Sequence, residues 1–411
     1  MKINKHCFPN GLRLVHYEDT STQMVALNIV YDVGARDEHP EHTGFAHLFE
    51  HLMFGGSAHI PDYDTPLQLA GGENNAWTNN DITNYYLTVP KPNVETAFWL
   101  ESDRMLELAF SEQSLEVQRG VVMEEFKQRC LNQPYGDVGH LFRPLAFRVH
   151  PYRWPTIGKE LSHIEQATLD EVKSFFYRFY APNNAVLAVT GNISWDETVK
   201  LTEKWSAPIP RRDVPVRQLP QEPEQTQERR LTVERNVPLD ALFMGYHMCS
   251  REGADYYAFD ILSDILSNGR SSRLNRRLVQ EQNIFSGIDA YISGTRDAGL
   301  LQISGKPAAG VSLEQAEAAV RKELEELQRS PVDGQELEKV KNKFESTQIF
   351  GNINYLNVAT NLAWFELTGK AEDIDLEVER YRSVTTEQLH TVAQRTFCES
   401  NAVVLYYKSD K

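Results

Sequence analysis

Two histidines and a glutamate within one short apolar segment are the residues of this sequence best suited to chemistry. His47 and His51 are four residues apart, and Glu50 directly precedes the second histidine. The apolar residues of segment 43–57 recur at helical spacing, so both imidazoles should lie on one helix face, one turn apart. Two imidazoles so placed can bind one metal ion, and the Glu50 carboxylate can act on a water molecule without being a ligand.

The spacing His-x-x-Glu-His reverses the commoner zinc-binding order His-Glu-x-x-His and is typical of one class of zinc enzymes. A pattern with three fixed positions also arises by chance, and a helix with two surface histidines is ordinary, so the motif needs support from elsewhere in the chain. A catalytic zinc normally takes three protein ligands and keeps a fourth position for water. A third ligand must therefore be sought in another segment.

The segment 112–131 is predicted to be a helix and is the natural source of that third ligand. Glu125 falls on the apolar face of this helix, whereas Glu124 points away from it. A carboxylate on an apolar face is costly unless it is paired or bound to a metal, so Glu125 is the candidate ligand. Pairing with a buried arginine or lysine is the alternative. The residues expected on the inward face are Leu115, Gln118, Val121, Val122 and Phe126.

Length and composition are those of a globular protein. A chain of 411 residues favours two or three domains, and 41% hydrophobic with 24% charged residues argues against global disorder. We find no run of 18 apolar residues and no apolar leader at the N-terminus, so we expect no membrane partner and a cytoplasmic location. The scattered cysteines should be reduced thiols. They are Cys7, Cys130, Cys249 and Cys398.

The formal net charge of −16 disfavours nucleic acid as a partner, because the summed field of the protein repels phosphate. Basic or neutral partners are favoured instead. Solubility alone also explains such a charge. If the negative charge lines an interior cavity, basic peptides would be drawn into it.

The chain shows signs of an internal duplication. Residues from Thr168 onward align without a gap with residues from Thr385 onward, and each stretch is predicted to be a helix running into a buried strand. Identical residues recur 217 positions apart, at Thr168, Arg178, Asn184, Ala185 and Val186 and again at Thr385, Arg395, Asn401, Ala402 and Val403. The proline-rich, charged segment 208–230 reads as a linker. We therefore expect an N-terminal domain over 1–207 and a homologous C-terminal domain over 231–411.

The duplication also provides an internal comparison for the histidine motif. When residues 49–56 are aligned with 262–269, Asp260, Ser263 and Asp264 fall opposite the two histidines and the glutamate. The second copy keeps the helix and lacks the ligands. If packing required histidines at these positions, the twin helix should carry residues of similar bulk.

Together these features resemble the pitrilysin/insulinase family of zinc peptidases, and more closely its half-length members, which are similar to the subunits of the mitochondrial processing peptidase. The resemblance covers almost the whole chain. It is carried by residues 10–12, 44–57, 75–78 with 83–86, 119–125 and 271–274. It implies zinc as the cofactor. It also implies an α+β fold of two homologous domains, each a mostly antiparallel sheet backed by helices, that forms half of a clam-shell chamber.

The resemblance implies roles for individual residues. His47, His51 and Glu125 would be the zinc ligands, and Glu50 would be the general base that activates water for attack on a peptide carbonyl. In this family the third ligand is a glutamate about seventy to eighty residues beyond the second histidine. Here 73 residues, 52–124, separate His51 from Glu125. The family spacing and the apolar face of the helix therefore select the same carboxylate.

A substrate-binding strand is expected next to this site. The segment 76–89 is rich in aromatic and β-branched residues around an Asn-Asn-Asp turn, which predicts a hairpin. The resemblance implies that Asn75 and Ala76 lie on an edge strand that binds substrate as an added β-strand. Read without the family, Asn75 is equally a turn residue before the hairpin.

Three residues depart from the family pattern. Gln118 stands where the family usually has a glutamate that supports a ligand, and Val279 and Ser286 stand where active members have an arginine and a tyrosine that contact the substrate. The resemblance therefore implies a heterodimer with a homologous subunit carrying that arginine and tyrosine, or else a homodimer. The expected function is zinc-dependent hydrolysis of short or unfolded peptides. The alternative is a non-catalytic, zinc-containing peptide-binding or scaffold subunit.

Overall fold

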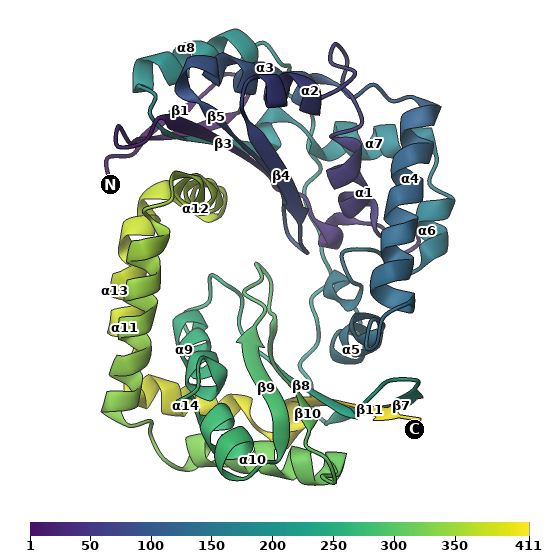
Figure 1. Cartoon of the computed structure of the whole chain (residues 1–411), viewed down its shortest axis with the longest axis vertical. Coiled ribbons are helices and arrows are strands. Elements are labelled where there is room, and N and C mark those ends of the chain that lie inside the picture. The colour runs from purple at the N-terminus through teal and green to yellow at the C-terminus, as the bar shows by residue number, and fades with distance from the viewer. Residues whose placement is uncertain (411) are drawn as a thin grey trace. The chain divides into compact units, whose positions relative to one another are not determined.

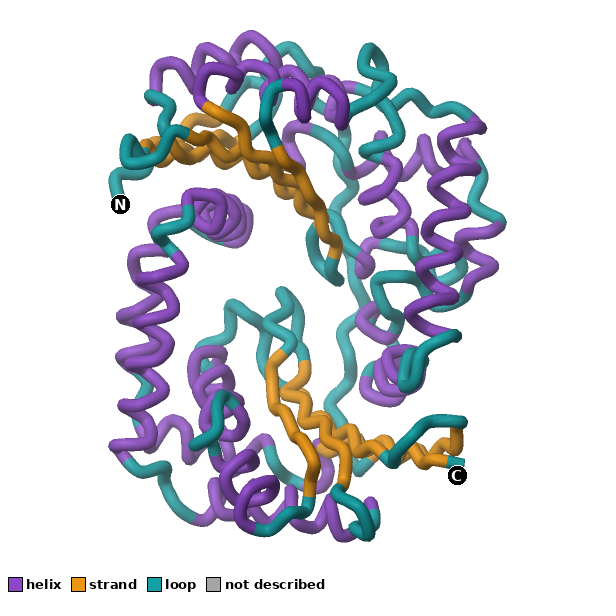
Figure 2. The backbone as a smooth tube through the Cα atoms, in the orientation of Figure 1, coloured by secondary structure: helices purple, strands orange, loops and turns teal. Residues whose placement is uncertain are grey.

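The computed structural model describes residues 1–410, which form two compact units. Unit 1 comprises residues 1–129, 154–220 and 349–376, and unit 2 comprises residues 130–153, 221–348 and 377–410. Each unit contains one β-sheet with helices packed on it (Figure 1). The strands of the two sheets are drawn in orange in Figure 2. The α+β class expected from the sequence is confirmed.

The sheet of unit 1 has six strands in the order β1-β2-β6-β3-β5-β4. Strands β2 and β6 are parallel, and all other neighbouring strands are antiparallel. The bounds are β1 Asn4–Cys7, β2 Arg13–Glu18, β3 Met24–Tyr31, β4 Glu73–Thr78, β5 Thr83–Pro90 and β6 Ala185–Gly191. Strand β6, from much later in the chain, lies between β2 and β3.

Strand β3 shows why this sheet needs helices on both faces. Val25, Leu27 and Ile29 belong to the core on one face, whereas Ala26 and Val30 belong to the core on the other. Successive side chains of a strand point to opposite faces, so the largely apolar β3, in which Asn28 is the one polar residue, contributes to both cores at once.

Different helices cover the two faces. The larger core is shared with α1 Phe45–Leu52, α3 Val94–Leu106, α7 Leu169–Phe179 and α8 Trp195–Trp205. On the opposite face, α12 Tyr355–Thr368 packs against β3 and β6. The other helices of unit 1 are α2 Asp64–Leu69, α4 Glu112–Phe126 and α6 Leu161–Glu165.

The sheet of unit 2 repeats the topology of unit 1 without the first strand. Its order is β7-β11-β8-β10-β9, which corresponds to β2-β6-β3-β5-β4, and β7 and β11 are again the parallel pair. The bounds are β7 Arg229–Arg235, β8 Ala241–His247, β9 Phe285–Ile292, β10 Leu300–Pro307 and β11 Ala402–Ser409.

Helices again cover both faces of the second sheet. One face packs against α9 Tyr256–Ser267, α10 Leu313–Arg329 and α14 Thr386–Thr396, and the other packs against α5 Val138–Ala146. The remaining helices are α11 Gly334–Gly351 and α13 Glu377–Ser383. Among residues 1–410, none of the helices combines the length and the apolarity needed to span a bilayer.

The repeat found in the sequence is also present in the fold. Helix α7 and strand β6 begin 217 positions before α14 and β11, respectively. Thr168 and Thr385 cap the two helices in the same way, each hydroxyl accepting a hydrogen bond from the backbone N–H three residues later. The matched segments therefore form the same helix-to-strand element in each unit.

The two units exchange a pair of equivalent helices. Helices α5 and α12 begin 217 positions apart, yet α5 packs on the sheet of unit 2 and α12 on that of unit 1. The compact units therefore differ from the expected contiguous domains 1–207 and 231–411. The physical reason is burial, because apolar side chains of α12 such as Leu362 cover the open face of the first sheet, and Phe142 of α5 covers that of the second.

The expected linker 208–230 is partly anchored on unit 1. Arg217 forms ion pairs with Asp37 at 2.6 Å and with Asp32 at 3.1 Å. The boundary between the units falls between residues 220 and 221, and β7 already begins at Arg229. Partly buried ion pairs therefore hold the first part of this segment in place.

We expect Leu362→Ala to destabilise unit 1. The side chain is fully buried between α12 and the first sheet, and such a truncation typically costs about 2–5 kcal/mol. Ile353→Ala is the matched control, because Ile353 is 70% exposed and its truncation should change stability by less than about 0.5 kcal/mol. Urea unfolding followed by circular dichroism measures both. Equal midpoints for the two variants would contradict the position of α12.

Candidate metal centre

Helix α1 brings its two histidines together because its apolar residues are buried. Phe45, Leu48 and Phe49 pack into the larger core of unit 1. His47 and His51 are one turn apart on this helix, and their ring centroids are separated by 4.9 Å. The apolar spacing that predicts the helix thus also places the imidazoles side by side.

Side chains from other segments fix the position of α1. Gly44 precedes the helix with φ of 90°, and a Cβ at this position would come within 2.9 Å of a backbone carbonyl oxygen, so glycine is required. The buried Glu38 carboxylate accepts hydrogen bonds from the N–H groups of Gly44 and Ala46, both at 2.9 Å. The hydroxyl of Tyr85 donates to the carbonyl of Phe49 at 3.2 Å. These contacts determine where the two imidazoles point.

Helix α4 supplies the expected third ligand, Glu125, from a distant segment. Its buried residues are Leu115, Val122 and Phe126, and Glu125 is half-buried. Val121 was expected on the inward face but is 46% exposed. It lies about 100° around the helix from Val122, and the buried stripe of α4 is too narrow to include it.

The Glu125 carboxylate reaches both imidazoles. Its Oε2 atom lies 3.3 Å from Nε2 of His51 and 3.6 Å from Nε2 of His47, where α1 and α4 run side by side (Figure 1). One possible ligand atom from each residue lies within 4.8 Å of the others, and no second such group occurs within residues 1–410. Ligands bound to zinc at about 2.1 Å in tetrahedral geometry are about 3.4 Å apart, so the three residues fit a zinc ion.

The protonation states of these residues also suit a metal. Burial lowers the pKa of His47 to about 4, so its imidazole is neutral near pH 7. Its Nδ1 atom is buried without a hydrogen-bond partner in the described chain, so the polar contact of this ring is on the side of Glu125. Hydrogen bonding to His51 lowers the pKa of Glu125 and favours the carboxylate. A carboxylate with neutral imidazole is a donor set that zinc prefers.

Arg129 holds the second oxygen of Glu125. Its Nη1 atom lies 2.9 Å from Oε1, whereas Oε2 faces the two histidines. Arg129 was not among the site residues predicted from the sequence, although a glutamate and an arginine four residues apart on a helix commonly pair. Arg129 is 68% exposed, so Glu125 pairs with an exposed arginine and not with the buried basic partner that was the alternative.

Glu50 lies half-buried on α1, next to His51. Burial raises its pKa, and the neighbouring Thr78 hydroxyl on β4 and the His51 imidazole partly oppose this shift. A carboxyl group with a raised pKa can accept and release a proton closer to neutral pH. The position of Glu50 next to His51 and its raised pKa are therefore those required of a general base.

Strand β4 forms an edge of the first sheet close to α1. Among the described strands it pairs only with β5, through Asn75 opposite Tyr86 and Ala76 opposite Tyr85. Asn75 is thus a strand residue, and the alternative of a turn before the hairpin is wrong. An edge strand has one row of backbone groups that can pair with an added strand.

Comparisons with known proteins identify the family. Residues 13–137 match the model of the insulinase family, peptidase family M16, and residues 166–344 match the peptidase M16 inactive domain. This chain belongs to the insulinase family. The resemblance inferred from the sequence is confirmed.

Relatives and solved structures match nearly the whole chain. The zinc protease PqqE of Helicobacter pylori is 26% identical over 405 residues, 97% of this chain and 91% of that protein. A crystal structure of a protease from Helicobacter pylori matches with a TM-score of 0.94 and 26% identity, over 99% of both chains. The periplasmic protease PqqL from Escherichia coli shares the fold, with a TM-score of 0.81 and 19% identity, over 99% of this chain and 47% of PqqL. This insulinase-family chain is therefore about half as long as PqqL.

Gln118 departs from the insulinase family pattern stated above and does not support a ligand. It is half-buried on α4, and its side chain lies near Gly55, just beyond the C-terminal end of α1. In the described structure its amide makes no hydrogen bond to the histidines or to Glu125. Apart from the two histidines, the side chain that pairs with this carboxylate is Arg129.

Val279 and Ser286 cannot replace the arginine and tyrosine implied for active members of the insulinase family. Val279 packs against the core of unit 2. Ser286 lies on β9, where its exposed hydroxyl donates to the carbonyl of Lys306 at 3.1 Å. Neither residue offers the guanidinium or phenol group that stabilises negative charge on a substrate.

Helix α9, the counterpart of α1 in unit 2, carries no ligand cluster within the described residues. Asp260 accepts a hydrogen bond from the Tyr381 hydroxyl, and Asp264 accepts one from Asn268 at 2.7 Å. Ser263 donates to the backbone of its own helix. The equivalent helix thus packs without imidazoles, so packing alone does not account for the two histidines of α1.

We expect Glu125→Gln to weaken zinc binding by at least about 100-fold, because the variant loses the only carboxylate that faces both imidazoles. Glu124→Gln is the matched control, since Glu124 is exposed and pairs with Lys127. Competition against a fluorescent chelator measures the affinity of both variants. Equal zinc affinity in the two proteins would contradict the assignment of Glu125.

Proposed function

We propose that this chain is the zinc-binding subunit of a metallopeptidase, with His47, His51 and Glu125 as ligands and Glu50 as the general base. The observation that carries the proposal is the approach of one carboxylate oxygen to two imidazole nitrogens at 3.3 and 3.6 Å. Membership of the insulinase family and the zinc protease PqqE among its relatives support it.

Zinc held by these residues would supply Lewis-acid chemistry, polarising a carbonyl oxygen and lowering the pKa of water. Glu50 takes a proton from the attacking water and transfers it to the nitrogen of the leaving amine, so the peptide C–N bond breaks without releasing an amide anion. Its raised pKa suits both steps, because the same carboxyl must first accept and then release the proton.

The edge position of β4 supports a preference for extended substrates. A peptide that adds to β4 as a further strand uses its backbone N–H and C=O groups, which Asn75 and Ala76 would meet. A folded protein does not offer a free extended segment. We therefore propose short or unfolded peptides as the substrate class.

We also propose that a partner chain completes the site. Val279 and Ser286 do not provide positively charged or phenolic donors, and the loss of such donors typically costs a few kcal/mol of transition-state stabilisation. The fold match to 47% of PqqL supports an arrangement in which two chains of this length do the work of one longer chain. The partner would be a homologous subunit with an arginine and a tyrosine, and a second copy of this chain is the alternative.

A non-catalytic, zinc-containing peptide-binding or scaffold subunit is the second candidate. Gln118, Val279 and Ser286 are the observations that favour it. Glu50 argues against it, because a site that only holds zinc has no use for a half-buried carboxyl with a raised pKa.

We expect Glu50→Gln to retain one zinc ion per chain and to lower peptide hydrolysis by about 10²- to 10⁴-fold, because the amide cannot accept the proton of the attacking water. A fluorogenic peptide assay of the complete assembly, with and without chelator, measures turnover, and elemental analysis measures zinc. Glu41→Gln, an exposed residue outside the ligand set, is the control. Undiminished turnover by Glu50→Gln, in material free of wild-type protein, would contradict the role of the base.

We expect the purified chain to hydrolyse peptides poorly at concentrations at which it is monomeric, and to gain activity when the homologous subunit is added. The specific activity, measured across a dilution series and followed by light scattering, separates the two possible assemblies. A gain at high concentration of this chain alone indicates a homodimer. Full activity of the monomer would contradict the need for a partner.

A further inference from the structure

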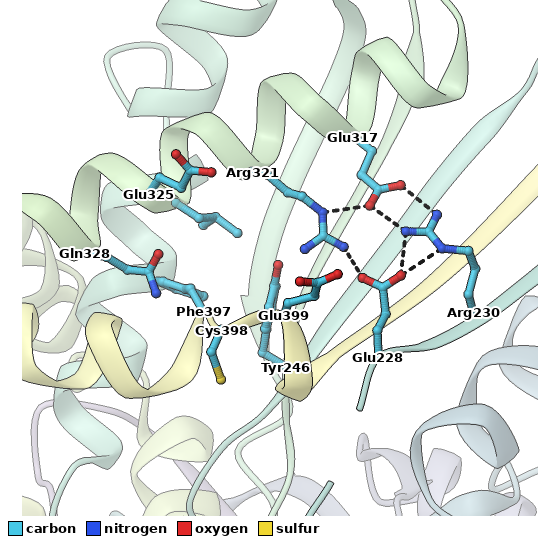
Figure 3. Close-up of a pocket in the computed structure, with 11 residues that line it drawn as sticks. Glu228, Arg230, Tyr246, Glu317, Arg321, Glu325, Gln328, Phe397, Cys398 and Glu399 are labelled. Carbon is cyan, nitrogen blue, oxygen red and sulfur yellow. Dashed lines mark hydrogen bonds and ion pairs between the residues drawn. The ribbon is translucent and has the colours of Figure 1, made fainter. Parts of the chain in front are cut away.

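Unit 2 contains a pocket of about 440 Å³ that shares no residue with the metal centre. Its walls come from β7, β8, α10 and the segment that follows α14 (Figure 3). The polar residues of its lining that matter here are Glu228, Arg230, Tyr246, Glu317, Arg321 and Glu399. A space of this size holds a small molecule or one long side chain.

One side of the pocket is a charge-balanced network of two arginines and two glutamates. Arg230 pairs with Glu317 through two hydrogen bonds of 2.7 and 2.8 Å, and Arg321 pairs with Glu317 at 2.7 Å. Both arginines also pair with Glu228 (Figure 3). Burial opposes the charge of Glu317, but hydrogen bonds from its partners lower its pKa to about 2. These arginines are therefore already neutralised and are not available to an anionic ligand.

The lining also carries two carboxylates, Glu399 and Glu325, that its two arginines do not pair with. Glu399 is exposed, and its carboxylate has no ion-pair or hydrogen-bond partner within residues 1–410. Glu325 pairs with Arg329, which lies outside the pocket lining, at 2.7 Å. The field inside the pocket therefore favours a cation.

The hydroxyl of Tyr246 is a second feature of the pocket that suits a hydrogen-bond donor, independent of the carboxylates. Its side chain is 1% exposed, and its hydroxyl makes no hydrogen bond to any residue that the structure describes. Figure 3 shows this hydroxyl pointing into the pocket, toward Arg321 and Glu399. Because this hydroxyl faces the pocket and has no partner within the described chain, it can accept a hydrogen bond from a ligand donor.

We propose that this pocket binds an alkyl chain that ends in an ammonium or guanidinium group. The cation donates hydrogen bonds to the carboxylate of Glu399 and to the hydroxyl of Tyr246, and its stem packs against Phe397 and Leu324. The rings of Tyr246 and Phe397, which meet edge to face at 5.3 Å, add a wall that suits a cation. Two sources share this chemistry, the side chain of a lysine or arginine in a peptide and a free polyamine.

The inference goes beyond the proposed peptidase function and does not depend on it, because zinc, Glu50 and the partner chain take no part. Isothermal titration of the full chain with n-butylamine, N-acetyl-lysine amide and spermidine tests the site directly. The uncharged probes 1-butanol and N-acetyl-norleucine amide are the controls. Only the charged probes should bind, and their affinity should fall as salt is added. Tighter binding of spermidine indicates a polyamine, and tighter binding of the lysine amide indicates a peptide side chain.

Two variants test the residues assigned to the cation. Glu399→Gln removes the charge, and Tyr246→Phe removes the hydroxyl while keeping the ring, so each should weaken binding of n-butylamine by about threefold to tenfold. Glu379→Gln is the matched control, since Glu379 is also exposed, has no partner within residues 1–410 and lies outside the pocket. Circular dichroism verifies that each variant is folded. Equal binding of charged and uncharged probes, or unchanged affinity in both pocket variants, would overturn the proposal.

Discussion

The burial of one face of α1 against the first sheet is the constraint on which the rest of the site depends. Phe45, Leu48 and Phe49 can enter the core in only one rotation of the helix, and that rotation leaves both imidazoles on the side of α4. The Glu38 carboxylate fixes the start of the helix. Because the core is close-packed, the helix cannot turn to release the histidines without losing this burial. Apolar packing therefore sets the positions of the two imidazoles relative to α4.

The two units share their sheet and helices, but the candidate metal ligands occur in only one of them. The five strands of unit 2 keep the order of β2-β6-β3-β5-β4, and both units have the same helix-to-strand element, yet only the α1 copy brings ligand-type side chains together within the described chain. In the second unit the equivalent carboxylates bond to Tyr381 and Asn268. The second face of each sheet is covered by a helix from the other half of the sequence, α12 in unit 1 and α5 in unit 2. The fold thus tolerates very different side chains at the same structural position.

The spacing of apolar residues within single segments was enough to predict several helices and strands and the residues on their buried faces. The helical spacing around His47 and His51, the apolar face that contains Glu125 and the strand pattern of 24–31 all depend on neighbours a few residues apart, and the structure has these elements as expected. The repeat at 217 positions was equally visible, because identical residues keep a constant offset. The family followed from the same motifs. The spacing of residues within a segment predicts which of them share a face, because helix and strand geometry are nearly constant.

Only the tertiary structure decided which distant segments meet. The division between domains was expected at the proline-rich segment between the two repeats, but packing assigned α5 and α12 to opposite units. Val121 was expected on the inward face, where the helix is in fact uncovered. The pairing of Arg129 with Glu125, and the pocket around Tyr246, came from the structure as well. The physical reason is that such contacts depend on how complete surfaces fit together, whereas a sequence displays only the preferences of each segment by itself.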